Sequence, residues 1–231
     1  MSLFITFEGP EGSGKSTQAR RLYERIAGAG YPVILTREPG GTPISENIRR
    51  IVLDLGNGEM DSTTEVLLFS AARAQLVAER IRPYLKLGGI VICDRFADAT
   101  YAYQGFGLGR DLDELRAVTQ IATGGLMPDI TILIDIPVEI GLSRKRAVAE
   151  RTAVSPLGPR TPTSGSPEWN RLDAREAVFH ERVRGGYQAL AAAEPGRWLV
   201  LDGRESMDAI ATSIWQQIQR RVLAITPLSR S

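Results

Sequence analysis

This sequence of 231 residues has little of several things, and each shortage excludes a class of protein. It has one cysteine, Cys93, so an internal disulfide cannot form, which suits a reducing compartment. Lys and Arg total 28 against 27 Asp and Glu, so the net charge of +1 gives no overall attraction to nucleic acid or membranes. No uncharged apolar run reaches the roughly 18 residues that a membrane span needs. The N-terminus enters a predicted strand at once, without the basic and apolar regions of a secretion signal. We therefore expect a soluble, cytoplasmic protein without a nucleic-acid or membrane partner.

Apolar runs and helical patterns alternate along the chain. The runs predicted as strands are Leu3–Phe7, Pro32–Thr36, Gly89–Cys93, Ile130–Ile136 and Trp198–Asp202. Near-continuous apolar strands separated by helices indicate a parallel sheet that is covered on both faces. The length suits one such domain, and no repeat or second domain boundary is visible. The predicted fold is a single α/β domain, 1–231, with five parallel strands.

The intervals between these strands carry helical patterns. The predicted helices cover Ser16–Ile26, Ile44–Leu53, Ser62–Arg82, Leu112–Thr123, a segment from about Val138, Leu172–Ala193 and Met207–Leu223. In the longest one, Ser62 is the predicted N-cap and Glu65 completes a capping box, with Pro83 just past the end.

The segment Gly9-Pro-Glu-Gly-Ser-Gly-Lys-Ser16 fits the phosphate-loop pattern G-x-x-x-x-G-K-[ST], between a predicted strand and a predicted helix. Glycine lets the backbone wrap an anion closely, and the helix N-terminus adds positive partial charge. In this pattern Lys15 reaches the β- and γ-phosphates and the Ser16 hydroxyl binds Mg²⁺. The alternative is a glycine-rich turn that merely caps a helix. The predicted ATP-binding residues are Gly9, Pro10, Glu11, Gly12, Ser13, Gly14, Lys15, Ser16 and Thr17.

Charged residues follow the predicted strands, where ligands of such sheets bind. Asp94 and Asp135 each stand at a strand end and could hold Mg²⁺; we favour Asp94 because the adjacent Arg95 suggests a phosphate. Arg37 and Arg95 at the same sheet edge predict a second phosphate site, since guanidinium groups meet phosphate oxygens bidentately. The alternatives are a capping role for either acid and weak surface ion pairs for the arginines.

Four segments together resemble thymidylate kinase, over a span from Ile5 to about Asp202: the phosphate loop, Arg37-Glu-Pro-Gly-Gly-Thr42, Asp94-Arg95-Phe96 with Ala102-Tyr-Gln-Gly105, and Phe179-His-Glu-Arg-Val-Arg-Gly-Gly-Tyr187. The resemblance implies a phosphate-loop NTPase fold of the nucleoside monophosphate kinase type with a mobile lid. It also implies phosphorylation of dTMP to dTDP with ATP and Mg²⁺, in dTTP synthesis for DNA replication, by a homodimer.

The same resemblance implies how the acceptor nucleoside is bound. Glu11 contacts the deoxyribose 3′-hydroxyl, Phe69 stacks on thymine, and Arg73 hydrogen-bonds the edge of the base. Thr100 approaches the base, and Tyr103 crowds the 2′ position against ribonucleotides. From the pattern alone, Phe69 is more often a core residue of an apolar helix, and Tyr103 could equally be a half-buried packing residue.

For the chemistry, the resemblance implies that Arg37 and Arg95 hold the dTMP phosphate and that Lys15 and Arg95 act in catalysis. The phosphate oxygen is already largely anionic near neutral pH, since its second pKa is about 6, so no general base is needed. The single histidine, His180, stands among charged residues and is predicted to be a solvated helix position. Cys93 is predicted to be a small buried residue of its strand.

Some thymidylate kinases carry a catalytic arginine in the phosphate loop, whereas others carry it on the lid. Here the loop position is Gly12, so the lid, 141–171, is expected to supply it. We predict Arg146 first and Arg151 second as catalytic residues, among the basic residues Arg144, Arg146, Arg151, Arg160 and Arg171. The alternative is a basic, solvated helix face.

The chain departs from the family pattern at three places. Ala99 replaces a common serine, Asn170 replaces a common aspartate, and a Pro-, Ser- and Gly-rich insert, 153–169, is predicted to be flexible. Another nucleoside monophosphate kinase, acting on dUMP, UMP or CMP, and a non-catalytic nucleotide-binding module are the alternative functions. A GTPase is disfavoured because no Asn/Thr-Lys-x-Asp loop occurs, and balanced charge disfavours a nucleic-acid ATPase.

Overall fold

The computed structural model describes residues 2–153 and 169–225, and for 151–153 it describes the backbone only. It contains a five-stranded parallel sheet in the order β2-β3-β1-β4-β5. The strands are β1 Leu3–Glu8, β2 Val33–Arg37, β3 Ile90–Asp94, β4 Ile130–Asp135 and β5 Trp198–Asp202. The predicted parallel α/β fold is therefore confirmed, and each predicted strand lies within two residues of its observed bounds.

The register of the central strands determines where the site lies. Asp94 at the end of β3 pairs with Phe7 of β1 on one side and with Arg37 of β2 on the other. The polar residues that follow these three strands therefore meet at one edge of the sheet. Asp135, at the end of β4, pairs with Asp202 of β5, farther along the same edge.

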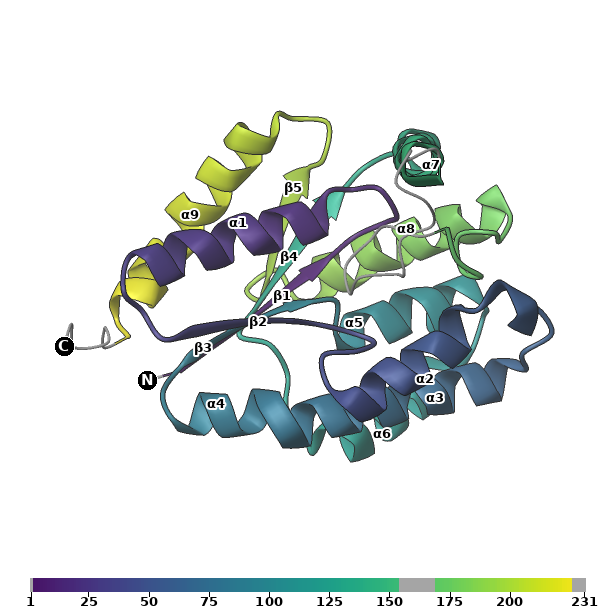
Figure 1. Ribbon diagram of the computed structural model, residues 1–231, viewed down its shortest axis with the longest axis horizontal. Helices are drawn as coiled ribbons and strands as arrows, with labels where there is room; N and C mark the ends of the chain where they lie inside the picture. The colour runs from purple at the N-terminus through teal and green to yellow at the C-terminus, as the bar shows by residue number, and fades with distance from the viewer. Residues whose placement is uncertain (1, 154–168, 226–231) are drawn as a thin grey trace.

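Helices cover both faces of the sheet, as Figure 1 shows. Helices α1 Lys15–Gly28 and α9 Met207–Leu223 cover one face, where Ile26 and Ile214 pack with Ile5 of β1. The other face carries a second core, in which Phe4 and Val91 of the sheet join side chains of the helices on that side. Successive residues of a strand point to opposite faces of the sheet, and helices cover both faces. All side chains of β1 are therefore buried, which explains its continuous apolar run. The helices and short turns on that side are α2 Pro43–Leu53, 3₁₀ turn Leu55–Asn57, α3 Ser62–Leu76, α4 Arg82–Lys86, α5 Ala97–Thr100, α6 Leu112–Thr123 and α8 Ala177–Ala193.

The predicted end of the long helix at Arg82 is wrong. Helix α3 leads into a π-helical turn, Val77–Ile81, and α4 then continues to Lys86 with Pro83 in its first turn. A proline has no N–H to donate and crowds the carbonyl four residues earlier, and the wider π-helical turn accommodates both effects.

The predicted cap of the same helix is also wrong. Asp61, not Ser62, is the N-cap, and its carboxylate accepts hydrogen bonds from the N–H groups of Thr63 and Thr64. Glu65 is fully buried and hydrogen-bonds residues of distant elements. A capping box therefore does not form, because Glu65 has stronger charged partners.

Two further differences concern the segments around the site. The sequence pattern missed α5 and the following π-helical segment Tyr101–Gly107, which carry the Ala102-Tyr-Gln-Gly105 motif. Helix α8 begins at Ala177, five residues later than predicted, because 170–176 form a turn closed by the Asn170 and Asp173 side chains. Helix α7, Val138–Ala153, agrees with the predicted start. Within the described residues, every helix is too short or too polar to cross a bilayer.

Candidate active site

The phosphate loop joins β1 to α1, and its glycines adopt conformations that side chains rarely allow. Gly9, Gly12 and Gly14 have φ values of 143°, 68° and 92°. A Cβ at position 12 would lie 2.0 Å from the carbonyl oxygen of Gly141, at the start of α7. An arginine at this loop position would therefore collide with the α7 backbone, which gives a physical reason for Gly12.

Lys15 lies on the inner side of this loop. Its ammonium group donates to the Pro10 carbonyl oxygen at 3.1 Å, and the side chain is almost fully buried. Burial, reinforced by the positive charge of Arg95, lowers the pKa of Lys15 to about 8. A second anion beside Lys15 and Arg95 would offset this desolvation and repulsion, so the pair is suited to binding phosphate.

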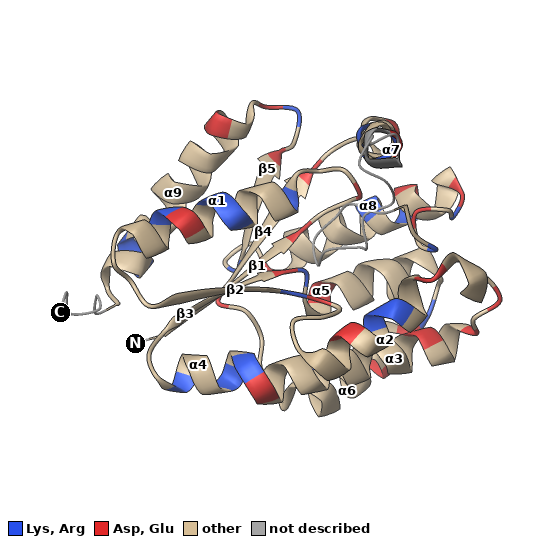
Figure 2. Cartoon of the chain, in the orientation of Figure 1, with Lys and Arg blue, Asp and Glu red and all other residues tan. Residues whose placement is uncertain are grey.

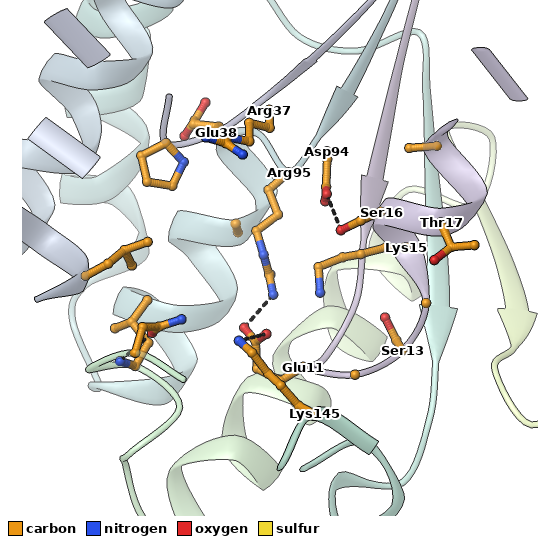
Figure 3. A pocket seen from close by; sticks show the side chains of 18 of the residues that line it. Glu11, Ser13, Lys15, Ser16, Thr17, Arg37, Glu38, Asp94, Arg95 and Lys145 are labelled. Carbon is orange, nitrogen blue, oxygen red and sulfur yellow. Dashed lines mark hydrogen bonds and ion pairs between the residues drawn. The ribbon is translucent and has the colours of Figure 1, made fainter. Parts of the chain in front are cut away.

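The two candidate acids of the sheet edge have different surroundings. Ser16, at the start of α1, donates a hydrogen bond from its hydroxyl to the Asp94 carboxylate at the end of β3, and the two side chains face each other (Figure 3). Asp135 instead accepts two hydrogen bonds from Arg184, at 2.7 and 2.9 Å, and one from Gln188. The structure thus brings Asp94, but not Asp135, against the Lys15–Thr17 end of the loop.

The arginines that line the cleft include Arg37, Arg49 and Arg95. Arg37 forms an ion pair with Glu46 at 3.0 Å, as the alternative interpretation of this arginine predicted, and it also lines the cleft. Arg49 was missed from the sequence, although its place in a predicted helix after the Arg37–Thr42 segment was visible. Burial, and next the nearby positive charge of Arg37, lower the pKa of Arg49.

Arg95 is at the centre of a hydrogen-bond network, and its backbone has a positive φ of 70°. Its guanidinium donates to Glu11 at 2.7 Å and to the hydroxyls of Tyr103 and Tyr187 at 2.9 Å each. Tyr103 in turn donates to Glu11 at 2.8 Å. The strained backbone directs the Arg95 side chain into the cleft, where three partners fix it.

Glu11 also has a partner that the sequence analysis did not single out. Lys145 of α7 lies 3.0 Å from Glu11, as Figure 3 shows, and 2.5 Å from Asp173. Burial alone would raise the pKa of Glu11, but the charges of Arg95, Lys15 and Lys145 hold it well below its usual value. Helix α7 is thereby tied to the phosphate loop through an ionised carboxylate.

Another part of the cleft is lined by Phe69, Arg73, Thr100 and Gln104. Arg73 is fully buried; it pairs with Glu38 and donates to the Thr100 hydroxyl at 2.7 Å. Its Nη1 atom is buried without a hydrogen-bond partner. Phe69 both lines the cleft and belongs to the core, so its two interpretations are compatible. Gln104 was missed, although it lies inside the quoted Ala102–Gly105 motif.

The basic residues predicted for the lid lie in different places. Arg144 donates to the Gly203 carbonyl at 3.0 Å, and the Arg146 guanidinium stacks 5.1 Å from the Trp169 ring. Arg171 is buried and pairs with Glu65 at 2.6 Å. The side chain of Arg151, with Arg160 and most of the insert 153–169, lies outside what the structure describes. Within the described part, Lys145 is the residue of the α7 basic run that contacts the phosphate loop.

The structure also tests the predicted burial of His180 and Cys93. His180 was predicted to be solvated, which is wrong: it is 3 % exposed, and burial lowers its pKa. It faces the protein interior because α8 packs that side against the second core, beside Phe179. Cys93 is buried as predicted, and burial raises the pKa of its thiol well above the usual value.

Together these residues line one continuous cleft of about 1860 Å³, from the phosphate loop to Phe69. A cavity for one small ligand measures roughly 300–1,000 Å³, so this cleft has room for two. Its phosphate-loop end contains the neighbouring cations Lys15 and Arg95. Figure 2 shows Lys and Arg among Asp and Glu on the helices and loops that surround the sheet. The geometry fits two nucleotides that approach each other through their phosphates.

Comparison with known proteins gives one consistent result. The family model described as thymidylate kinase matches residues 7–214. The chain is 61% identical over 228 residues to thymidylate kinase of Roseiflexus castenholzii, covering 99% of this chain and 97% of the relative. It is 56% identical to thymidylate kinase of Herpetosiphon aurantiacus, over 99% of this chain and 100% of the relative. The crystal structure of thymidylate kinase from Ehrlichia chaffeensis is similar with a TM-score of 0.71 and 31% identity, covering 94% of this chain and 98% of that chain.

Proposed function

The chain belongs to the thymidylate kinase family, an enzyme family that phosphorylates dTMP to dTDP with ATP, and we propose which of its residues carry out each part of that reaction. The observation that supports the assignment is a continuous cleft that is lined by the phosphate loop, by Arg37, Arg49 and Arg95, and by Phe69. ATP binds at the loop residues Gly9–Thr17, and dTMP occupies the other end. The product dTDP is a precursor of dTTP, which is used in DNA replication.

The acceptor phosphate lies between Arg37, Arg49 and Arg95. All three side chains line the cleft, and Arg95 is held by Glu11, Tyr103 and Tyr187. Guanidinium groups bind phosphate oxygens through paired hydrogen bonds, so they both neutralise and orient the group. Arg49 is added here to the two arginines that the sequence predicted.

The acceptor base lies against Phe69, with Arg73 and Thr100 at its edge. The buried, unpartnered Nη1 of Arg73 supports this role because a ligand acceptor would satisfy it. Tyr103 and Glu11 hydrogen-bond each other at the sugar position. A ribose 2′-hydroxyl would have to displace this fixed tyrosine, which favours deoxyribonucleotides.

Ser16 and Asp94 are the residues that would hold Mg²⁺. They present a hydroxyl and a carboxylate side by side, and hard oxygen donors suit this ion. The described residues contain no cluster of three or more His, Cys, Asp or Glu side chains that could hold a metal alone. Mg²⁺ fits such a sparse set because it retains waters and shares phosphate oxygens. When bound, the ion supplies positive charge to the phosphates of ATP.

The remaining chemistry is positioning and charge. An oxygen of the dTMP phosphate attacks the γ-phosphorus in line; the bond to the β-phosphate oxygen breaks, and ADP leaves with that electron pair. Lys15 and Arg95 both line the cleft, so their charges can stabilise the negative charge that spreads in the transition state. Lys145 adds a third cation from α7, and Arg146 and Arg151 keep their predicted catalytic roles as proposals.

Homodimerisation and a cytoplasmic location are proposed from the resemblance. Leu67, on the outer side of α3, is 55% exposed, which is compatible with an apolar contact between subunits. Val66 of the same predicted apolar segment is buried within the subunit, and so it is not available to such a contact.

ADP formation with ATP and Mg²⁺ against dTMP, dUMP, UMP, CMP and AMP tests the assignment. We expect strong turnover with dTMP and little with UMP. Efficient turnover with UMP or CMP would refute the base pocket and the Tyr103 sugar role while leaving the phosphate chemistry intact. Absence of turnover with every monophosphate would refute the acceptor assignment as a whole.

A further inference from the structure

Glu65 is a fully buried carboxylate that the reaction itself does not use. It lies in the first turn of α3, one turn before Phe69. One of its oxygens accepts from Arg171 and from Arg175, each at 2.6 Å, and the other accepts from the Gln104 side-chain amide at 2.7 Å. A carboxylate paired with two guanidinium groups can only accept hydrogen bonds, so its third partner must also be a donor.

This requirement determines which way the Gln104 amide points. Only its NH₂ group can face Glu65, and the amide oxygen therefore faces away from it. Gln104 is buried and lines the cleft together with Phe69, Arg73 and Thr100. The oxygen is thus the end of the amide that is left for a ligand.

The base pocket then presents one donor and one acceptor with defined positions. The donor is the unpartnered Nη1 of Arg73, and the acceptor is the Gln104 amide oxygen. Thymine offers the matching pair on its edge, a carbonyl O4 and an N3–H. Cytosine offers the reverse, an amino group and an unprotonated N3. A cytosine in this pocket would place donor against donor and acceptor against acceptor.

We propose that Glu65 is a positioning residue for base specificity, which holds the Gln104 amide in the orientation that accepts a hydrogen bond from an imide N–H. This inference rests on the proposed function. Arg171 and Arg175 hold the Glu65 carboxylate in place, and so the turn 170–176 that precedes α8 supports the base pocket from outside. Sites that use hydrogen bonds reject a mismatched partner strongly because buried groups are left unpaired.

The test is the ratio of kcat/KM for dTMP to that for dCMP in Glu65→Gln. A glutamine at 65 can donate as well as accept, so the Gln104 amide can turn over and accommodate cytosine. We expect the ratio to fall at least tenfold, and Glu65→Asp, which keeps the carboxylate, to retain most of the preference. Glu114→Gln is the matched control, because Glu114 also pairs with an arginine but at the surface, at 2.6 Å from Arg110.

A purely structural role would lower both rates and leave the ratio unchanged, and that result overturns the inference. If Glu65→Gln does not fold, Glu65→Gln/Arg175→Gln removes one charge of each sign and retains the net charge of the cluster; the same fall in ratio is expected. Wild-type protein that does not prefer dTMP to dCMP would refute the base pocket itself. An unchanged ratio in a variant of a dTMP-selective wild type refutes only the role of Glu65.

Discussion

Replacement of Glu38 by glutamine leaves the Arg73 guanidinium without its buried counter-ion. The pair joins the end of β2 to α3, and the side chains of Arg73 and Glu38 are 1% and 3% exposed. Both the Nε and Nη2 atoms of Arg73 donate to the carboxylate, and Nη2 also donates to Thr100. The substitution therefore tests stability and acceptor binding together.

The expected loss of stability follows from this burial. Removing one partner of a buried pair costs about 3–5 kcal/mol, because the remaining charge is neither solvated nor compensated. For a domain of this size, 1 kcal/mol corresponds to a shift of roughly 2–4 °C, so Tm is expected to fall by roughly 6–20 °C. Glu38→Leu/Arg73→Met, which removes both charges, is expected to recover most of that stability. It should not recover dTMP binding, since Arg73 supplies the donor at the base edge.

Thermal unfolding followed by circular dichroism, with KM for dTMP measured on the same preparations, checks this reasoning. Glu114→Gln serves as the control, because the pair it removes is exposed and worth no more than about 1 kcal/mol. A loss below about 1 kcal/mol for Glu38→Gln would refute the buried ion pair. A double variant that binds dTMP normally would refute the role of Arg73.

Three further predictions use neighbouring residues as controls. Lys145→Gln is expected to lower kcat by about 10²-fold or more, as for the loss of a charge-stabilising donor, and Arg146→Gln, which loses its contact with Trp169, by less; the reverse order in steady-state assays would make Arg146 the principal lid cation. Asp94→Asn should raise the Mg²⁺ concentration needed for half-maximal rate, whereas Asp135→Asn should not, and equal effects in a magnesium titration would contradict the placement of the metal beside Ser16. Burial raises the pKa of Glu8 from 4.5 to about 8, so the folded state binds the proton more tightly than the unfolded state, and stability is lost as pH rises through about 8. Wild-type Tm should therefore fall more steeply than that of Glu8→Gln between pH 6 and 9, and parallel melting curves would refute this.

Much of the fold could be predicted because it depends on neighbouring residues. Strand β1 has side chains buried on both faces, and this leaves a continuous apolar run that is readable in the sequence. Position 12 has a positive φ and lies close to the backbone of Gly141, so it needs a glycine, and that glycine is visible in the loop sequence. The predicted helix end at Pro83 was wrong because a π-helical turn lets the helix continue past this proline. The predicted N-cap Ser62 was wrong because the adjacent Asp61 caps the helix instead.

Most of the site residues named from the sequence line the observed cleft, because strand ends of a parallel sheet share one edge. Arg49, Gln104 and Lys145 were missed for a different reason. Each lies on a helical segment whose pattern shows its periodicity, but which residue faces the cleft depends on how that segment packs. His180 was misjudged in the same way, since charged neighbours in the sequence do not reveal which side of α8 faces the core.

The sequence by itself determined the parallel α/β fold, the phosphate loop and the kind of chemistry, because apolar periodicity, glycine conformation and a short motif are properties of adjacent residues. Tertiary structure alone decided that Asp94 rather than Asp135 meets Ser16, and that Glu65 joins Arg171 across 106 residues of chain. Likewise, Lys145 meets Glu11 from 134 residues away. Such contacts depend on how strands and helices pack in space, and separations of this length leave no local pattern from which they can be predicted.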